Sequence, residues 1–177
     1  MKLLLDLGAL VVNGDLNPSS LEHPKLQYHK TNVSKWADLI ALFKQAKTVN
    51  GRIDHAFANA GIGGRDPYLE EKLDANGELL EPNHKVIDVN LKAVINTSHL
   101  AFHYMRHQSP AGGSVVLTAS ASSFQRFLVT DYTTAKHGVL GTSSMMLIGT
   151  YKILTLSLQV SCEVLYRTSR RLVCPCA

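Results

Sequence analysis

Short apolar runs alternate with longer segments of helical periodicity along the chain. Turn-forming residues bound each run, a pattern typical of strands buried on both faces of a parallel sheet. The strands predicted from these runs are 9–12, 26–29, 53–58 and 115–117. Strands that alternate with helices favour an α/β fold.

Four segments carry the helical pattern. The first, 1–8, ends at Gly8, and glycine favours the position just after a helix. Ser34 is the predicted N-cap of the second helix. The apolar stripe of this helix consists of Trp36, Leu39, Ile40, Phe43 and Ala46. The third and fourth helices are predicted over 84–105 and 132–146.

The remaining segments have weaker patterns. Residues 64–83 are polar and rich in turn formers, which predicts a loop with one helical turn at most. The apolar stretch 153–160 fits either a strand or a buried helix, and the pattern does not decide between them. Residues 167–177 are predicted to form a loose tail.

Composition narrows the class of protein. The 177 residues are 45% hydrophobic and 18% charged, which is typical of one soluble globular domain. The net charge of +4 is mild, and the basic residues are scattered apart from Arg167, Arg170 and Arg171, so we expect no nucleic-acid partner. No apolar run approaches the ~18 residues that span a bilayer, so we expect no membrane association.

The cysteines Cys162, Cys174 and Cys176 all lie near the C-terminus. Their odd number and spacing indicate neither a disulfide framework nor a usual zinc site. We therefore expect no metal site and a reducing, cytoplasmic location. A zinc or nucleic-acid module built from this Cys- and Arg-containing tail is the least favoured interpretation.

Candidate chemistry follows the strand 115–117. Tyr132 and Lys136 lie four residues apart on the predicted fourth helix and therefore share a face. A neighbouring ammonium favours the phenolate form of a tyrosine. Ser120, at the carboxyl end of the strand, can bring a hydroxyl to the same place. These three side chains predict an acid/base centre.

The spacing of Tyr132 and Lys136 is not specific by itself. Tyr68 and Lys72 repeat it after a glycine- and proline-containing loop. No buried strand that ends in serines precedes this second pair, so we expect Tyr68 and Lys72 to be a solvated pair without a catalytic role.

The segment around Ser120, Tyr132 and Lys136 resembles the active site of the short-chain dehydrogenase/reductase family, in particular its NAD-dependent hydroxyprostaglandin-dehydrogenase-like members. The resemblance implies that these three residues are catalytic, with Ser122 as the alternative serine. It also implies that Asn90, in the sequence Asp-Val-Asn-Leu, completes a tetrad. In the family this asparagine bends its helix and orders a water that leads to the lysine.

The resemblance also predicts where the adenosine half of a dinucleotide binds. Asp15 and Leu16 follow the strand 9–12, where a carboxylate accepts hydrogen bonds from the ribose and repels a 2′-phosphate. This favours NAD over NADP. Asn32 and Val33 stand where the family has an Asp-Val pair, and the Asn32 carbonyl can accept a bond from the adenine amino group.

The other cofactor-binding residues are predicted near the nicotinamide. Asn59, Ala60 and Gly61 form the Asn-Ala-Gly sequence that follows the fourth strand of the family. The resemblance implies that they stabilise the sheet and line the cofactor site. Tyr132 and Lys136 complete the set, and the resemblance implies that Lys136 holds the nicotinamide ribose.

The resemblance covers residues 1–144, and it lacks the segment with which the family's fold begins. The family opens with a strand and a Thr-Gly-x-x-x-Gly-x-Gly turn that binds the pyrophosphate, and neither is found here. We therefore expect a gap in the sheet between the strands 9–12 and 53–58. We expect residues 145–177 to be a divergent tail without the family's sixth strand, and our hypothesis is an incomplete gene model or a truncated isoform.

The sequence thus predicts an incomplete Rossmann-like fold, a doubly wound parallel sheet flanked by helices. The predicted function is hydride transfer between NAD, less favourably NADP, and a small-molecule alcohol or ketone. A homo-oligomer formed through the family's interface helices is a further expectation. The alternative is a catalytically inactive remnant that acts, if at all, by binding partners.

Overall fold

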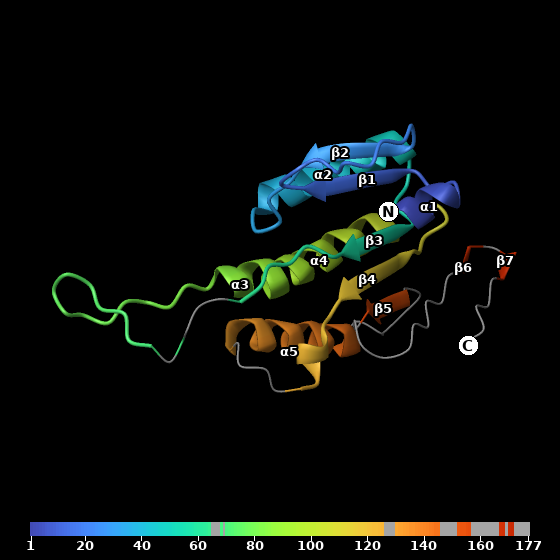
Figure 1. Cartoon of the computed structure of the whole chain (residues 1–177). Helices are drawn as coiled ribbons and strands as arrows, with labels where there is room; N and C mark the ends of the chain where they lie inside the picture. Colours follow the sequence, from blue (N-terminus) through green and yellow to red (C-terminus); the bar gives the residue numbers. More distant parts are fainter. Residues whose placement is uncertain are drawn as a thin grey trace.

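The computed structural model of the 177-residue chain describes residues 1–64, 68, 70–125 and 130–143, and the backbone of 144–145, 152–156, 167–168 and 170–171. Helices and parallel strands alternate (Figure 1). The elements before the central loop are α1 (Lys2–Asp6), β1 (Val11–Asp15), β2 (Leu26–Lys30), α2 (Trp36–Asn50) and β3 (His55–Ala58). Those after it are α3 (Lys85–Ile87), the π-helical turn η1 (Asp88–Lys92), α4 (Ala93–Arg106), β4 (Ser114–Thr118), the 3₁₀ turn η2 (Ala121–Ser123), α5 (Thr130–Met145), β5 (Lys152–Leu156), β6 (Arg167–Thr168) and β7 (Arg170–Arg171).

The parallel strands form two separate sheets. One contains β1 and β2, and the other has the order β3-β4-β5. In the described part of the chain no strand connects β1 to β3, so the predicted gap is confirmed. The fold is α/β and Rossmann-like, with an incomplete sheet.

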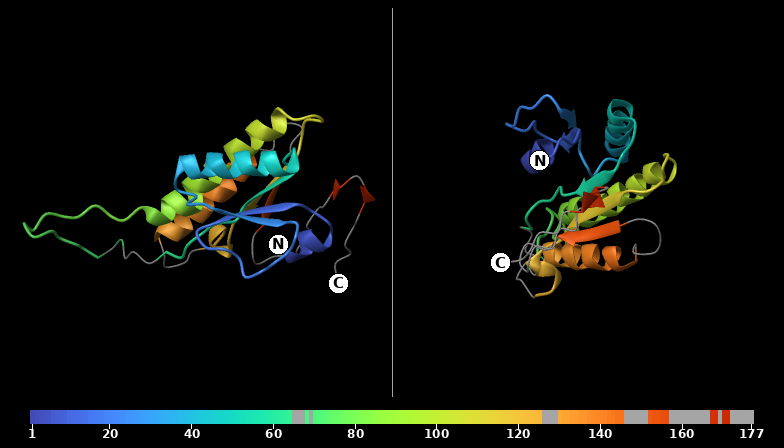
Figure 2. Two further views of the ribbon diagram at one scale, coloured as in Figure 1. Left: turned by 90° about the horizontal axis from the view of Figure 1, so that it is seen from above. Right: turned by 90° about the vertical axis from the view of Figure 1, so that its right-hand side faces the viewer.

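The helices α2, α4 and α5 lie along one face of the strands, and the short α1 lies on the other (Figure 2). Between this helical layer and the sheet lies the core. Its fully buried side chains include Leu39, Met105, Val115, Leu117 and Val139. Burying one such side chain stabilises the folded state by roughly 1.5–3 kcal/mol, so this layer holds β4 and α5 firmly together.

The strand β1 differs from its predicted bounds of 9–12. It begins at Val11 and continues through Asn13 and Gly14 to Asp15, which is its last residue. A Cβ at Gly14 would clash with the side chain of Leu42 on α2. The Asn-Gly pair therefore belongs to a strand against which a helix packs closely, and not to a turn.

The start of α2 also differs from the prediction, because Lys35 and not Ser34 is its N-cap. The side-chain carbonyl of Asn32 accepts bonds from the Ser34 N–H at 3.1 Å and the Ser34 hydroxyl at 2.7 Å. The carboxylate of Asp38 accepts a bond from the Asn32 N–H at 2.9 Å. Ser34 is thus committed to a turn that precedes the helix.

The central loop extends far from the body of the molecule (Figure 1). Its described residues form no helical turn, and a single antiparallel bridge joins Leu73 to Leu79. Within this bridge the Asp74 carboxylate accepts backbone bonds from Asn76 and Glu78, which lower the pKa of Asp74.

The C-terminal part adds one strand to the sheet. Lys152–Leu156 forms the strand β5, which is parallel to β4. The sequence pattern of 153–160 fits either a strand or a buried helix, and the first residues of this stretch, up to Leu156, form a strand. Two short strands, β6 and β7, pair within the predicted tail; the cysteines lie outside the described residues.

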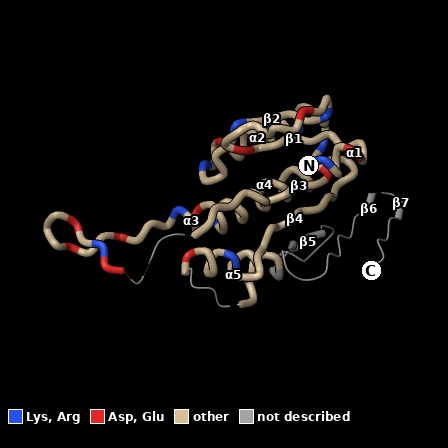
Figure 3. Tube along the Cα trace, viewed as in Figure 1, with Lys and Arg blue, Asp and Glu red and all other residues tan. Residues whose placement is uncertain are grey.

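Along the described part of the trace, Lys and Arg are interspersed with Asp and Glu (Figure 3). Across the described ranges, no helix has the length and apolar character that a membrane crossing requires. The same residues contain no group of three His, Cys, Asp or Glu side chains arranged to hold a metal ion.

Candidate active site

The predicted site residues gather at one edge of the sheets. Parallel strands bring their carboxyl ends to the same edge, which is where ligands bind in open α/β folds. Asp15 ends β1, Asn59 follows β3, and Ser120 follows β4. The helix α5 then returns along β4 and presents Tyr132 and Lys136.

Lys136 is anchored beside Tyr132. The Lys136 ammonium donates a hydrogen bond of 2.7 Å to the backbone carbonyl of Thr118, at the end of β4. It lies 5.7 Å from the centre of the Tyr132 ring, within the range of a cation–π contact. Lys136 is only 4% exposed, and this burial lowers its pKa because desolvation disfavours the charged form.

The serines after β4 form a compact turn that is tied to α5. The Ser120 hydroxyl accepts the Ser122 N–H at 3.2 Å and donates to the Ser122 hydroxyl at 3.4 Å. The Ser123 hydroxyl donates to the Lys136 carbonyl at 2.7 Å. Ser122 is 6% exposed and Ser120 is half-buried, so Ser120 is the more accessible of the two predicted serines.

Asn90 lies inside the π-helical turn η1 and is fully buried. π-turns are frequent at functional sites. The Asn90 carboxamide donates to the Ile62 carbonyl at 2.8 Å and accepts the Ile62 N–H at 2.8 Å. A Cβ at Gly61 would lie 3.4 Å from the Asn90 carbonyl oxygen and 4.0 Å from the Lys136 nitrogen. Asn90 and Lys136 therefore approach the same stretch of backbone.

Asn59 connects the ends of two strands. Its carbonyl oxygen accepts a 2.8 Å bond from the Thr118 hydroxyl. This bond joins the segment that follows β3 to the end of β4. Ala60 and Gly61 follow Asn59 as exposed residues and leave their backbone accessible.

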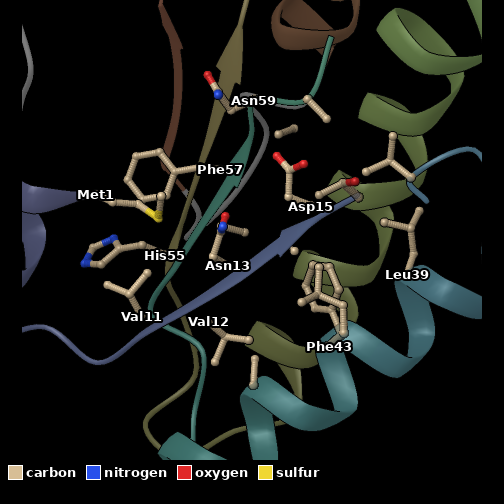
Figure 4. A pocket seen from close by; sticks show the side chains of 18 of the residues that line it. Met1, Val11, Val12, Asn13, Asp15, Leu39, Phe43, His55, Phe57 and Asn59 are labelled. Carbon is tan, nitrogen blue, oxygen red and sulfur yellow. The ribbon is translucent and has the colours of Figure 1, made fainter. Parts of the chain in front are cut away.

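Asp15 and Asn59 line one cavity of about 770 Å³ between β1 and β3 (Figure 4). Asp15 is exposed, and its carboxylate accepts only a local bond, 3.1 Å long, from the Asn17 N–H among the described contacts. Leu16 is 55% exposed. Val33 is half-buried against the core and lines the same cavity.

Asn32 lies nearby but its side chain is occupied. Its carbonyl oxygen already accepts two bonds from Ser34, and an amide oxygen has two lone pairs. An adenine amino group would therefore have to displace one of these bonds, and the contact of Asn32 with adenine stays a prediction.

The second Tyr/Lys pair lies elsewhere. Tyr68 is in the central loop, and its hydroxyl donates to the Asn83 carbonyl at 3.2 Å. Tyr68 also lies 3.3 Å from the His84 ring nitrogen. The described contacts of Tyr68 are therefore with Asn83 and His84, at the end of the central loop.

Several supporting residues were not predicted from the sequence. The Thr118 carbonyl holds Lys136, the Ile62 backbone holds Asn90, and Ser123 joins the serine turn to α5. Asp131 is also buried, and one of its oxygens accepts the Tyr132 N–H at 2.6 Å. Backbone acceptors have no sequence signature, whereas Thr118 and Ser123 were visible as hydroxyl residues that flank the end of a strand.

The alternation of helices with parallel strands is that of a Rossmann-like α/β fold. A family model described as short chain dehydrogenase matches residues 12–152. A short-chain dehydrogenase/reductase, ascJ of Acremonium egyptiacum, is 52% identical over 143 residues, which is 78% of this chain and 48% of the relative. The chain belongs to the short-chain dehydrogenase/reductase family, and it spans about half the length of this relative.

Solved structures agree on the fold. A short chain dehydrogenase from Mycobacterium smegmatis matches with a TM-score of 0.62 and 23% identity, over 76% of this chain and 55% of that one. An alcohol dehydrogenase from the archaeon Thermococcus sibiricus, complexed with 5-hydroxy-NADP, matches with a TM-score of 0.61 and 23% identity, over 75% and 53% of the two chains. At this identity they show the fold alone.

Proposed function

We propose that this edge of the sheet is the catalytic centre of an oxidoreductase that interconverts a small-molecule alcohol and its carbonyl compound with NAD. One observation carries the proposal: the Lys136 ammonium lies over the Tyr132 ring and is fixed there by the carbonyl that ends β4. A buried cation beside a half-buried phenol is the arrangement that an acid/base tyrosine requires.

Each residue has a separate role in this proposal. Tyr132 takes the hydroxyl proton of an alcohol or returns it to a carbonyl oxygen. Ser120 donates a hydrogen bond to the same oxygen and orients it. Lys136 favours the phenolate through its charge, and Asn90 holds the loop after β3 in place. The nicotinamide, when bound, supplies the hydride acceptor or donor.

The described residues fit the two ends of a dinucleotide. The exposed carboxylate of Asp15 suits ribose hydroxyls and disfavours a 2′-phosphate, which supports NAD over NADP. Gly61 leaves bare backbone beside Lys136, where a Cβ would already be in van der Waals contact with the Asn90 carbonyl oxygen and the Lys136 nitrogen. Residues 1–177 contain no glycine-rich pyrophosphate turn, so cofactor binding is proposed for a form of the protein in which this turn is supplied.

The alternative, an inactive remnant, is not favoured by the family match. Association of two copies through the family's interface helices, and a cytoplasmic location, stay predictions. The substrate class is proposed only as an alcohol or a ketone, since the described residues define no substrate pocket beyond the shared edge.

NADH titration followed by fluorescence tests the proposal. The protein is residues 1–177 fused behind the segment of the Acremonium relative that precedes its matched residues. We expect saturable binding, and Gly61→Val should weaken it about tenfold or more because the new side chain contacts Asn90 and Lys136. Gly63→Val is the matched control, because a Cβ at Gly63 has no atom within 4 Å. Equal effects of the two substitutions would refute the proposed site.

A further inference from the structure

The helix α4 carries three exposed histidines in its last two turns, and each follows the one before by four residues. Side chains four apart lie on the same face of a helix. The rings of His103 and His107 have their centroids only 4.8 Å apart. The ring of His99, one turn earlier, lies beside Trp36, with the two centroids 6.4 Å apart. His103 and His107 are therefore the pair that the structure brings together.

A hydrogen bond fixes which nitrogen of His107 is free. Its Nδ1 lies 2.8 Å from the backbone carbonyl oxygen of His103. A carbonyl can only accept, so Nδ1 donates, and in the neutral ring Nε2 keeps its lone pair. Histidines that bind metals are commonly oriented by such a bond from their other nitrogen. Among the described contacts the His103 ring packs edge-on against Tyr104 and has no hydrogen bond, so it also keeps a nitrogen that can accept.

The position at the end of the helix favours a bound cation. The last carbonyls of a helix carry partial negative charge, and α4 ends at Arg106 with His107 as its C-cap. In both views of Figure 2 this end of α4 projects beyond α2 and α5. The charge of Arg106 opposes a second cation, but its side chain is exposed and salt screens such a repulsion. Capping of the helix would require His107 alone, whereas a metal ion uses both rings.

We propose that His103 and His107 together bind one divalent transition-metal ion of the type of Zn²⁺, through one ring nitrogen each. Imidazole is a favourable ligand for Zn²⁺, Ni²⁺ and Cu²⁺. Binding to one ring makes binding to the second intramolecular, so the pair holds the ion far more tightly than a single histidine does. The described residues contain no group of three possible ligands, so water completes the coordination.

This site differs from the expectation of no metal site, which rested on the number and spacing of the cysteines. The helical spacing of His103 and His107 is the signal in the sequence that points to it. The inference is independent of the proposed function, since it requires neither a cofactor nor turnover.

Calorimetric titration of residues 1–177 with Zn²⁺ tests the proposal, with the cysteines blocked by N-ethylmaleimide because thiolates also bind Zn²⁺. We expect one ion per chain, and His103→Gln and His107→Gln should each weaken binding about 10²-fold. His137→Gln is the matched control, because the exposed His137 makes the same bond, 2.9 Å long, to the carbonyl of Thr133 but has no histidine one turn away. Equal effects of the three substitutions, or no saturable binding by the wild type, would overturn the proposal.

Two further measurements identify the ligands. His99→Gln should change Zn²⁺ affinity by less than about threefold, because the remaining pair still chelates the ion; a greater loss than in His107→Gln would show that His99 and not His107 is the ligand and would contradict the pair. Cu²⁺ bound to the wild type should show two nitrogen ligands by electron paramagnetic resonance, and Cu²⁺ bound to His107→Gln should show one. A single nitrogen ligand in the wild type would also overturn the proposal.

Discussion

The side chain of Asn90 and the backbone of Ile62 exchange two hydrogen bonds, each 2.8 Å long, between positions 28 residues apart. The pair joins the π-helical turn η1 to the loop that follows β3. The carboxamide thus uses both its donor and its acceptor to hold the backbone next to Lys136. Asn90 is a positioning residue in this structure.

Asn90→Ala should therefore lower the free energy of unfolding by about 2 kcal/mol, since each lost bond contributes roughly 1 kcal/mol. Urea unfolding measures this change. Asn96→Ala, on the helix α4 that continues from the same turn, is the control and should change stability by less than about 0.5 kcal/mol. Equal losses in the two variants would contradict the role of the Ile62 pair.

Burial lowers the pKa of Lys136 below its ordinary value of 10.5. Between the folded pKa and 10.5 the unfolded state binds more protons, so the contribution of Lys136 to the free energy of unfolding rises with pH in that window. Below the folded pKa the full cost of burying the charge is present. The stability of the wild type relative to Lys136→Met should therefore increase as the pH approaches 10.5 from below.

Urea unfolding of both proteins from neutral pH upward checks this difference. Lys44→Met, which replaces an exposed lysine of α2, is the control for the loss of a lysine charge elsewhere on the surface. A relative stability of the wild type that falls with rising pH would show instead that Lys136 is stabilised as a cation in the folded protein.

Asp15 should set the choice of cofactor in the fusion described above. Its exposed carboxylate would face the 2′ position of the adenosine ribose. Asp15→Ala should narrow the preference for NAD over NADP about tenfold, by weakening the first and relieving repulsion of the second. The ratio of the two kcat/KM values measures this, and an unchanged ratio would exclude Asp15 from cofactor selection.

Much of the fold was predictable because buried strands and helices leave strong apolar patterns. The strands at 26–29 and 115–117 and the helices at 84–105 and 132–146 lie close to their predicted bounds. The end of β1 was not predictable, because Asn13 and Gly14 are typical turn residues, whereas here they pair with β2 and Gly14 lies where a side chain would clash with Leu42 on α2. The prediction of Ser34 as the N-cap of α2 was also wrong. Ser34 donates its N–H and its hydroxyl to the Asn32 side chain, and the helix begins after Lys35.

The candidate site was predictable from motifs but its supports were not. Ser120, Tyr132, Lys136 and Asn90 were identified by resemblance to the family, and the structure brings these segments to one edge. The Thr118 carbonyl and the Ile62 backbone hold two of them, and no side-chain pattern indicates such acceptors. The volume of the cavity between β1 and β3 likewise requires coordinates.

Turnover of Tyr132→Phe tests the central claim, that Tyr132 is the acid/base residue of an oxidoreductase. The measurement is NADH formation by the fusion with a set of primary and secondary alcohols, beside NADH binding by fluorescence. Removing a general acid/base should lower kcat on the order of 10²- to 10⁴-fold and leave NADH affinity within about twofold, while Tyr68→Phe should have the wild-type rate. A Tyr132→Phe rate within about tenfold of the wild type would contradict the assignment of Tyr132.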